Sequence, residues 1–226
     1  MVPGLSELVR WAGPDPVAAI NISVYRCDAL LLASGTVTCV PLPGVSPAVL
    51  AGKVAVLDRV LAGAGNEEAV SEPRGPNAVL SEILEWLWDC IAGPVLGALG
   101  YRETGGETGG EAGADMGGRL WWMPTGGLGA LPLHAAGYHR EGAGRTVLDR
   151  AVSSYTVTVR ALGQGRGHPG VVRALWEVGA GSPGLCDRIA GRGSPARALR
   201  EAVRELRDDG RAGLPLAWAG YLHSGR

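Results

Sequence analysis

Cysteine and histidine are the residue types in this 226-residue sequence that most readily supply a nucleophile and a base. The chain holds four of each: Cys27, Cys39, Cys90 and Cys186, and His134, His139, His168 and His223. A thiol and an imidazole meet in space and not in sequence, so any pairing is allowed in principle. Each thiol also has a plainer interpretation, because two lie in or beside apolar strand-like runs, one lies in a helical pattern and one lies in a Gly/Pro-rich stretch. Structural cysteines of this kind far outnumber catalytic ones, so we expect no catalytic residue among them.

Motifs for other chemistries are missing from the sequence. Gly52-Lys53 lacks the preceding glycine and the following Ser or Thr of a phosphate-binding loop. His134 and His139 are five residues apart and have no third metal ligand in an obvious position. Ser153-Ser154 lies in a strand-like run, where hydroxyls usually make cross-strand hydrogen bonds, and no serine occupies a G-x-S-x-G turn. We therefore expect no cofactor, no metal ion and no serine nucleophile.

Composition restricts the partners. The formal net charge of −1 provides no field that would attract nucleic acid, so we expect none to bind. The cysteines form no C-x-x-C pair, and residues 1–16 lack the apolar core of a signal peptide, which favours a cytoplasmic location. The longest uncharged run, 29–52, is interrupted by Pro41, Pro43 and Pro47, so we expect no membrane segment. Proteins are the class of partner that these observations leave open.

The first hundred residues predict a small sheet followed by two helices. Residues 17–24, 28–34 and 36–40 are strand-like, and Ser34-Gly35 between the last two predicts a hairpin turn. Ser46-Pro47 predicts the start of a helix that ends at Gly63. Apolar residues then recur at helical spacing over 77–99, and Gly93-Pro94 predicts a kink within that helix.

The remainder of the chain starts after a glycine-rich segment. Residues 102–118 contain seven Gly and almost nothing to bury, which predicts a flexible loop. We expect strands over 119–123, 147–159 and 171–176, the last of buried type, and a helix over 194–210 that begins at Ser194. Its predicted apolar stripe and the tryptophan pairs are assigned to the core: Leu199, Ala202, Val203 and Leu206, and at least one each of Trp86/Trp88 and Trp121/Trp122.

Two ordered segments, 119–137 and 147–162, are similar to the N-terminal half of CHAT domains, which are relatives of the caspases. Three later segments, 171–178, 198–207 and 215–225, resemble the late strand, last helix and closing segment of that family. The resemblance implies an α/β fold, specifically a caspase-like three-layer sandwich. It also implies three parts: 1–101 packing on the domain, the loop 102–118, and a partial CHAT domain over 119–226.

The sequence departs from the family where the catalytic histidine and cysteine should lie. CHAT domains place two strand ends with these residues between the Ser-Ser-Tyr strand and the Leu-Trp strand, and here only 163–170 fills that interval. His168 lacks the strand before it and the glycine after it, so no catalytic residue is carried over. The resemblance thus implies a sheet truncated in its middle and a catalytically inactive regulatory or interaction domain.

Two alternatives stay open at this point: a cysteine endopeptidase in a full-length form, and a non-functional product of exon loss or of an incorrect gene model. A sheet without its central strands would expose apolar faces and unpaired edges unless the flanking strands pair with each other. We therefore expect instability or self-association of the isolated chain.

Overall fold

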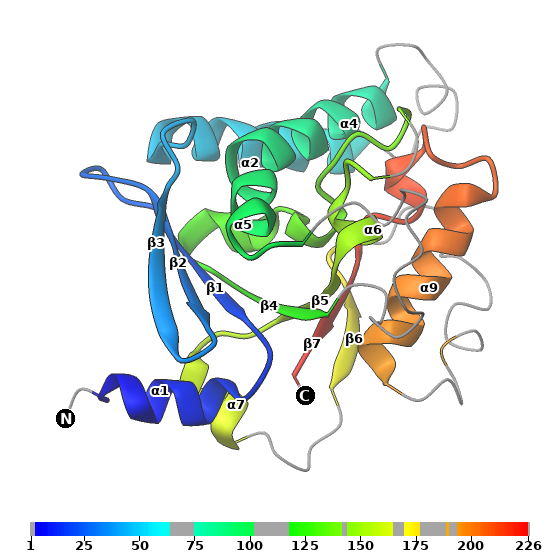
Figure 1. Ribbon diagram of the computed structural model, residues 1–226. Coiled ribbons are helices and arrows are strands. Elements are labelled where there is room, and N and C mark those ends of the chain that lie inside the picture. Colours follow the sequence, from blue (N-terminus) through cyan, green and yellow to red (C-terminus); the bar gives the residue numbers. More distant parts are fainter. Residues whose placement is uncertain are drawn as a thin grey trace.

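Seven strands form one sheet in the computed structural model, which describes residues 3–63, 75–101, 118–141, 144–164, 170–176, 189 and 194–225 (Figure 1). The order is β3-β2-β1-β4-β5-β7-β6, in which β1, β4, β5 and β7 are parallel and the outer strands are antiparallel to their neighbours. The bounds are β1 Val17–Asn21, β2 Asp28–Ala33, β3 Thr36–Pro41, β4 Arg119–Pro124, β5 Val152–Tyr155, β6 Val171–Ala174 and β7 Tyr221–Ser224. The predicted α/β class is confirmed.

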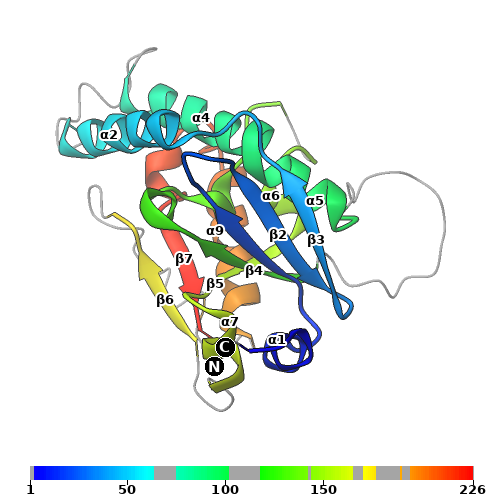
Figure 2. The same cartoon turned by 90° about the vertical axis from the view of Figure 1, so that its left-hand side faces the viewer.

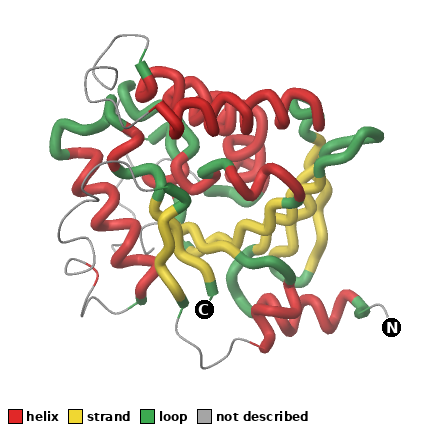
Figure 3. The backbone as a smooth tube through the Cα atoms, turned by 180° about the vertical axis from the view of Figure 1, so that it is seen from behind, coloured by secondary structure: helices red, strands yellow, loops and turns green. Residues whose placement is uncertain are grey.

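Helices cover both faces of the sheet (Figures 1 and 2). One face carries α2, α4 and α5, the other carries α1 and α7, and α9 lies along the β5–β7–β6 end, as the view from behind also shows (Figure 3). The α-helices are α1 Leu5–Ala12, α2 Pro47–Gly63, α4 Pro76–Leu87, α5 Gly93–Ala98, α6 Val147–Arg150, α7 Val159–Gln164 and α9 Pro195–Asp208. A π turn, η1 (Trp88–Ala92), and three 3₁₀ turns, η2 (Gly126–Ala130), η3 (Leu133–Ala135) and η4 (Pro215–Ala217), complete the described elements.

The predicted hairpin and the predicted helix starts are confirmed. Ser34 and Gly35 have φ angles of 49° and 78°, the left-handed pair that a two-residue turn between β2 and β3 requires. The Ser46 hydroxyl accepts a hydrogen bond from the Val49 N–H at 3.2 Å and so caps α2. The irregularity expected at Gly93-Pro94 takes the form of the π turn directly before Pro94, which opens the helix where the proline ring would crowd it.

Two predictions in the second half were wrong in part. Residues 147–159 do not form one strand, because Thr146 caps a helical turn, α6, by accepting the Asp149 N–H at 3.0 Å, and only β5 is extended. The strand predicted at 171–176 is β6, an outer strand whose Val171 is 51% exposed, since a short apolar run does not distinguish a central strand from an edge. The predicted helix start at Ser194 is confirmed, although the Ser194 hydroxyl accepts from Arg119 at 3.0 Å and makes no hydrogen bond to the helix backbone.

The core lies on both faces of the sheet because alternate strand residues point in opposite directions. Trp122 joins the large cluster formed with α2, α4 and α9, whereas Trp121 joins a small cluster with Ala12 of α1 and Leu162 of α7. Trp88 is buried, so each tryptophan pair contributes to the core as predicted. The predicted stripe of α9 is buried as well.

The sheet is continuous at the predicted break. β7 lies directly beside β5, with Tyr155 opposite Ser224, and β6 pairs with the other side of β7. The flanking strands, β5 and β6, do not pair with each other directly, but β7 lies between them and pairs with both. The segment 102–117 lies outside the described residues, so its predicted flexibility stays a prediction. In the described part of the chain, no helix combines the length and apolar character needed to cross a bilayer.

Candidate functional site

The three described thiols are those of Cys27, Cys39 and Cys90. Cys27 is buried and its Sγ lies 3.5 Å from the Ser23 carbonyl oxygen, while Cys39 is exposed on β3 and accepts from Arg26 at 3.5 Å. Cys90 lies in the π turn, where burial raises the pKa of its thiol and the nearby Asp89 charge raises it further. None of these three forms a hydrogen bond with a described histidine. Cys186 and His168 lie outside the described residues.

His134 and His139 hold the segment between β4 and β5 in place. His134 donates from Nε2 to the Ala219 carbonyl oxygen at 3.0 Å, so its Nδ1 accepts from the Tyr155 hydroxyl at 3.0 Å. His139 donates to the Ala135 carbonyl oxygen at 2.7 Å and meets the Trp218 ring edge-on. Burial lowers the pKa of both histidines to about 4, so both are neutral and structural.

The structure brings together one serine–histidine pair that lies 69 residues apart in the sequence. Ser154 Oγ on β5 lies 3.0 Å from Nδ1 of His223 on β7, and Ser153 accepts from the Trp122 indole at 3.0 Å. The predicted cross-strand role of these hydroxyls is confirmed. Ser154 is fully buried and His223 is 1% exposed, so a substrate has no access to either. The pair reinforces the contact between β5 and β7.

A groove of about 470 Å³ lies between α2 and the ends of β1 and β4. Its walls are mostly aliphatic, and its polar groups are one carboxylate, one hydroxyl and a glycine pair: Ile22, Pro47, Leu50, Ala51, Val54, Ala55, Asp58, Thr125, Gly126 and Gly127. This volume is within the usual range of ligand pockets, about 300–1,000 Å³. By contrast, a cavity between α9 and β5 measures about 20 Å³, which is room for about one water molecule.

Local chemistry shapes the floor of the groove. Thr125 follows β4, and its hydroxyl donates to the Ile20 carbonyl oxygen at 2.8 Å and accepts from the Ile22 N–H at 3.3 Å. This links the carboxyl ends of the two parallel strands beyond their ladder. Gly126 has a φ of 56°, which side chains rarely adopt, and a Cβ at Gly127 would contact Val54 at 3.7 Å. Gly126 therefore permits the backbone conformation of this loop, and the missing side chain of Gly127 leaves space in the groove beside Val54.

The wall formed by α2 has helical spacing. Its groove-lining residues recur once per helical turn, at 47, 50/51, 54/55 and 58, and so share one helix face: Pro47, Leu50, Ala51, Val54, Ala55 and Asp58. Eleven residues separate the first from the last, which corresponds to about 16 Å along the helix. Asp58 makes no ion pair or hydrogen bond with a residue that the structure describes, so its carboxylate is available to a ligand.

The groove also occupies the place where open α/β sheets bind ligands. From β1 the chain continues to β2 on one side, whereas from β4 it continues to β5 on the other side. Such a reversal at the carboxyl ends of adjacent parallel strands creates a crevice, because the two connections leave in opposite directions. No sequence pattern marks Asp58 or Thr125 as a site residue, since only the parallel pairing of β1 with β4 forms the groove that they line.

No family model and no curated protein sequence matches this chain. Among the described residues, no group of three or more His, Cys, Asp and Glu side chains is arranged to hold a metal ion. What the geometry offers is a surface groove with an aliphatic wall and a single carboxylate, an arrangement suited to binding.

Proposed function

We propose that this chain is a CHAT-related domain of caspase-like architecture that binds a protein partner and has no thiol-dependent peptidase activity. The ordered resemblance over 119–225 supports the family, and the parallel strands with helices on both faces are compatible with it. The observation that carries the proposal is the direct pairing of β5 with β7. In the family, the strand ends with the catalytic histidine and cysteine lie between the Ser-Ser-Tyr strand and the Leu-Trp strand, which correspond here to β5 and to β6, the strand on the other side of β7.

The state of the thiols supports the absence of catalysis. Thiol proteolysis needs a thiolate beside an imidazole and donors for the developing oxyanion. The described thiols have no imidazole partner, and the raised pKa of Cys90 keeps that thiol protonated at neutral pH. A chain with this arrangement acts by binding.

The groove beside α2 is the binding surface in this proposal. It is an open channel on the surface, and three of its lining residues on α2, Ala51, Ala55 and Asp58, are exposed. An extended peptide rises about 3.3 Å per residue, so the 16 Å wall corresponds to roughly five residues of a partner. The two exposed alanines leave room for the side chains of such a segment.

The catalytic half of the proposal is tested with a diverse peptide library and a thiol-directed active-site probe. The parent chain and a variant with all four Cys replaced by Ser should give the same background hydrolysis, because no thiolate is activated. Cleavage by the parent chain that disappears in the Cys-free variant would establish a peptidase and refute the proposal.

The binding half is tested by selecting peptides from a random displayed library on the parent chain. Selected peptides should lose at least about tenfold in affinity for Ala55→Trp, because the indole fills the groove from an exposed position and removes the buried contact area. Val157→Trp is the matched control, since Val157 is 86% exposed and lies outside the groove. Equal loss in both variants, or no loss in Ala55→Trp, would exclude the groove as the binding surface.

A further inference from the structure

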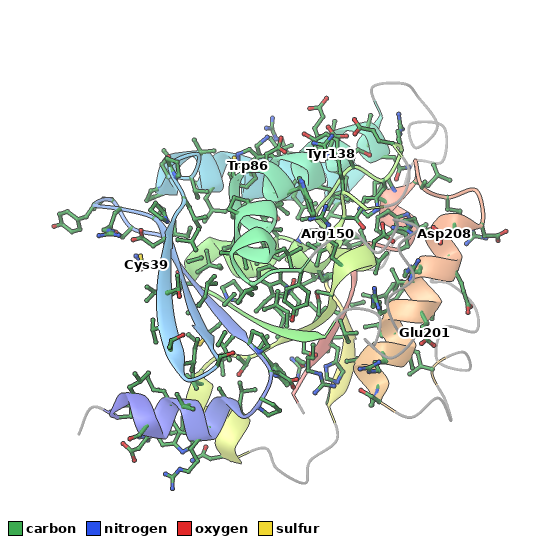
Figure 4. All side chains as sticks on the ribbon, viewed as in Figure 1. Cys39, Trp86, Tyr138, Arg150, Glu201 and Asp208 are labelled. Atoms are coloured by element: carbon green, nitrogen blue, oxygen red, sulfur yellow. The ribbon has the colours of Figure 1, made fainter. Side chains whose placement is uncertain are left out.

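The outer strand β3 is unusually unprotected. Its residues are exposed, except Val40, which is half-buried, and Figure 4 shows Cys39 on the outer side of the strand. Natural edge strands are blocked by charged side chains, bulges or interior prolines, because a free edge otherwise pairs with another strand. The stretch 36–40 contains none of these charges or prolines, and Pro41 stands only at its end.

The hairpin turn determines which backbone groups of β3 are free. In a two-residue hairpin the residues that flank the turn form a hydrogen-bonded pair, and the pairs alternate from there. Ala33–Thr36 flank the turn, so Thr36 and Thr38 direct their N–H and C=O groups toward β2. The N–H and C=O groups of Val37 and Cys39 consequently point outward, toward no other strand of the sheet.

We propose that β3 pairs with β3 of a second copy of this chain in an antiparallel, two-fold symmetric ladder centred on Thr38. In this register Val37 lies opposite Cys39 of the second copy, so all four outward groups on each strand form hydrogen bonds. Shifting the centre to Cys39 would bring Pro41, which lacks an N–H, opposite Val37. A shift to Val37 would bring Cys39 against the turn residue Gly35. Thr38 is therefore the centre that satisfies the most donors and acceptors.

The side chains of this edge favour a second copy over an unrelated partner. Two-fold pairing places Thr38 opposite Thr38 and Val37 opposite Cys39 of the second copy, and an uncharged strand makes no like-charge contact in doing so. Leu30 and Val37, 42% and 50% exposed, lie on the same face of the hairpin. The two-fold axis would join these side chains to their counterparts in one apolar strip. Arg26, which donates to Cys39 at 3.5 Å, is paired with Asp28 at 2.5 Å.

This inference does not depend on the family resemblance or on the groove. The pairing involves one short strand from each copy, so the contact area is small and the dimer is weak. We therefore expect a reversible dimer with a Kd between about 10 µM and about 1 mM, and not a permanent oligomer.

Disulfide trapping tests the register. In a background with the four native Cys replaced by Ser, Thr38→Cys should form a covalent dimer under mild oxidation. The two Cα atoms of a non-hydrogen-bonded antiparallel pair lie about 4.5 Å apart, within the range of a disulfide. Thr36→Cys is the control, because its counterpart lies four residues along the ladder, at about 14 Å. No cross-linking in either variant, or equal cross-linking in both, would overturn the proposal.

Sedimentation velocity gives an independent readout that needs no cysteine. Val37→Lys adds a charge to each strand of the ladder and should weaken dimerisation at least about threefold, the effect of one exposed charge contact. Val171→Lys places the same change on the other outer strand, β6, and should leave dimerisation unchanged. A monomer at all concentrations, or equal weakening by both substitutions, would refute the β3 interface.

Discussion

Asp149 is the residue whose replacement should most clearly destabilise the fold. Its carboxylate accepts from both terminal nitrogens of Arg207, at 2.9 and 3.1 Å, and from the Thr146 hydroxyl at 2.7 Å. The Asp149 and Arg207 side chains are 6% and 8% exposed. Arg200 donates to the carbonyl oxygens of Leu148 and Asp149, both at 2.8 Å. These contacts join α6 to α9, which lies along the β5–β7–β6 end of the sheet.

The substitution Asp149→Asn keeps the shape of the side chain and removes its charge. Loss of one partner of a buried ion pair costs about 3–5 kcal/mol, because the other charge stays buried. Arg207 retains a bond to Asp208 at 2.7 Å, a residue 55% exposed, which favours the lower part of that range. For a chain of this length, each kcal/mol lowers Tm by about 2–4 °C, so Tm should fall by about 6–20 °C.

Thermal and urea denaturation of the parent chain and of Asp149→Asn measure this difference in the free energy of unfolding. Glu141→Gln is the control, since it removes an exposed ion pair to Arg145 of 2.8 Å and should cost under about 1 kcal/mol. The double variant Asp149→Leu/Arg207→Met should recover much of the loss, because the buried charge of Arg207 is removed together with that of Asp149. A loss below about 1 kcal/mol in Asp149→Asn would refute the reasoning.

Two further predictions concern pH and backbone packing. The free energy of unfolding should decrease as the pH falls from 6.5 to about 4. His134, His139 and His223 are neutral in the fold, because burial is the main cause that lowers their pKa values to about 4, and they take up protons on unfolding. Equal Tm values at pH 7.5 and pH 5 would contradict this prediction. Gly170→Ala should lower the free energy of unfolding by about 1–3 kcal/mol, because the new Cβ would overlap the imidazole of His223. Gly129→Ala is the control: Gly129 has open space around it, so this change should alter the free energy by under about 0.5 kcal/mol. Equal effects in denaturation experiments would show that the contact between Gly170 and His223 is absent.

The pairing of β5 with β7 bears on the expected instability of the chain. Tyr155–Ser224 is a short ladder, reinforced by the buried bond between Ser154 and His223. Strand pairing removes the internal edges that a truncated sheet would expose, and it leaves β3 and β6 as the outer strands. The free edge relevant to self-association is thus at the β3 end, away from the predicted break.

The sequence by itself determined the elements with strong local signals. The Ser34-Gly35 hairpin, the helix start at Ser46-Pro47 and the apolar stripe of α9 follow from turn preferences, capping and periodicity, which act over a few residues. The same signals were misleading over 147–159, where Thr146 and Asp149 form a helical turn that β-propensity does not predict. Local patterns also left α1 unrecognised, since its apolar face is meaningful only against α7.

Only the tertiary structure decided where chemistry and binding could occur. The pairing of β1 with β4 unites Thr125, Ile22 and Asp58 in one groove, although their positions in the sequence span more than a hundred residues. The tertiary structure also decided the position of β6: its short apolar run predicts a buried strand, whereas the strand order places it at an edge of the sheet. Strand order and burial depend on contacts between distant segments, whose free energy is set by the whole core and not by any local pattern.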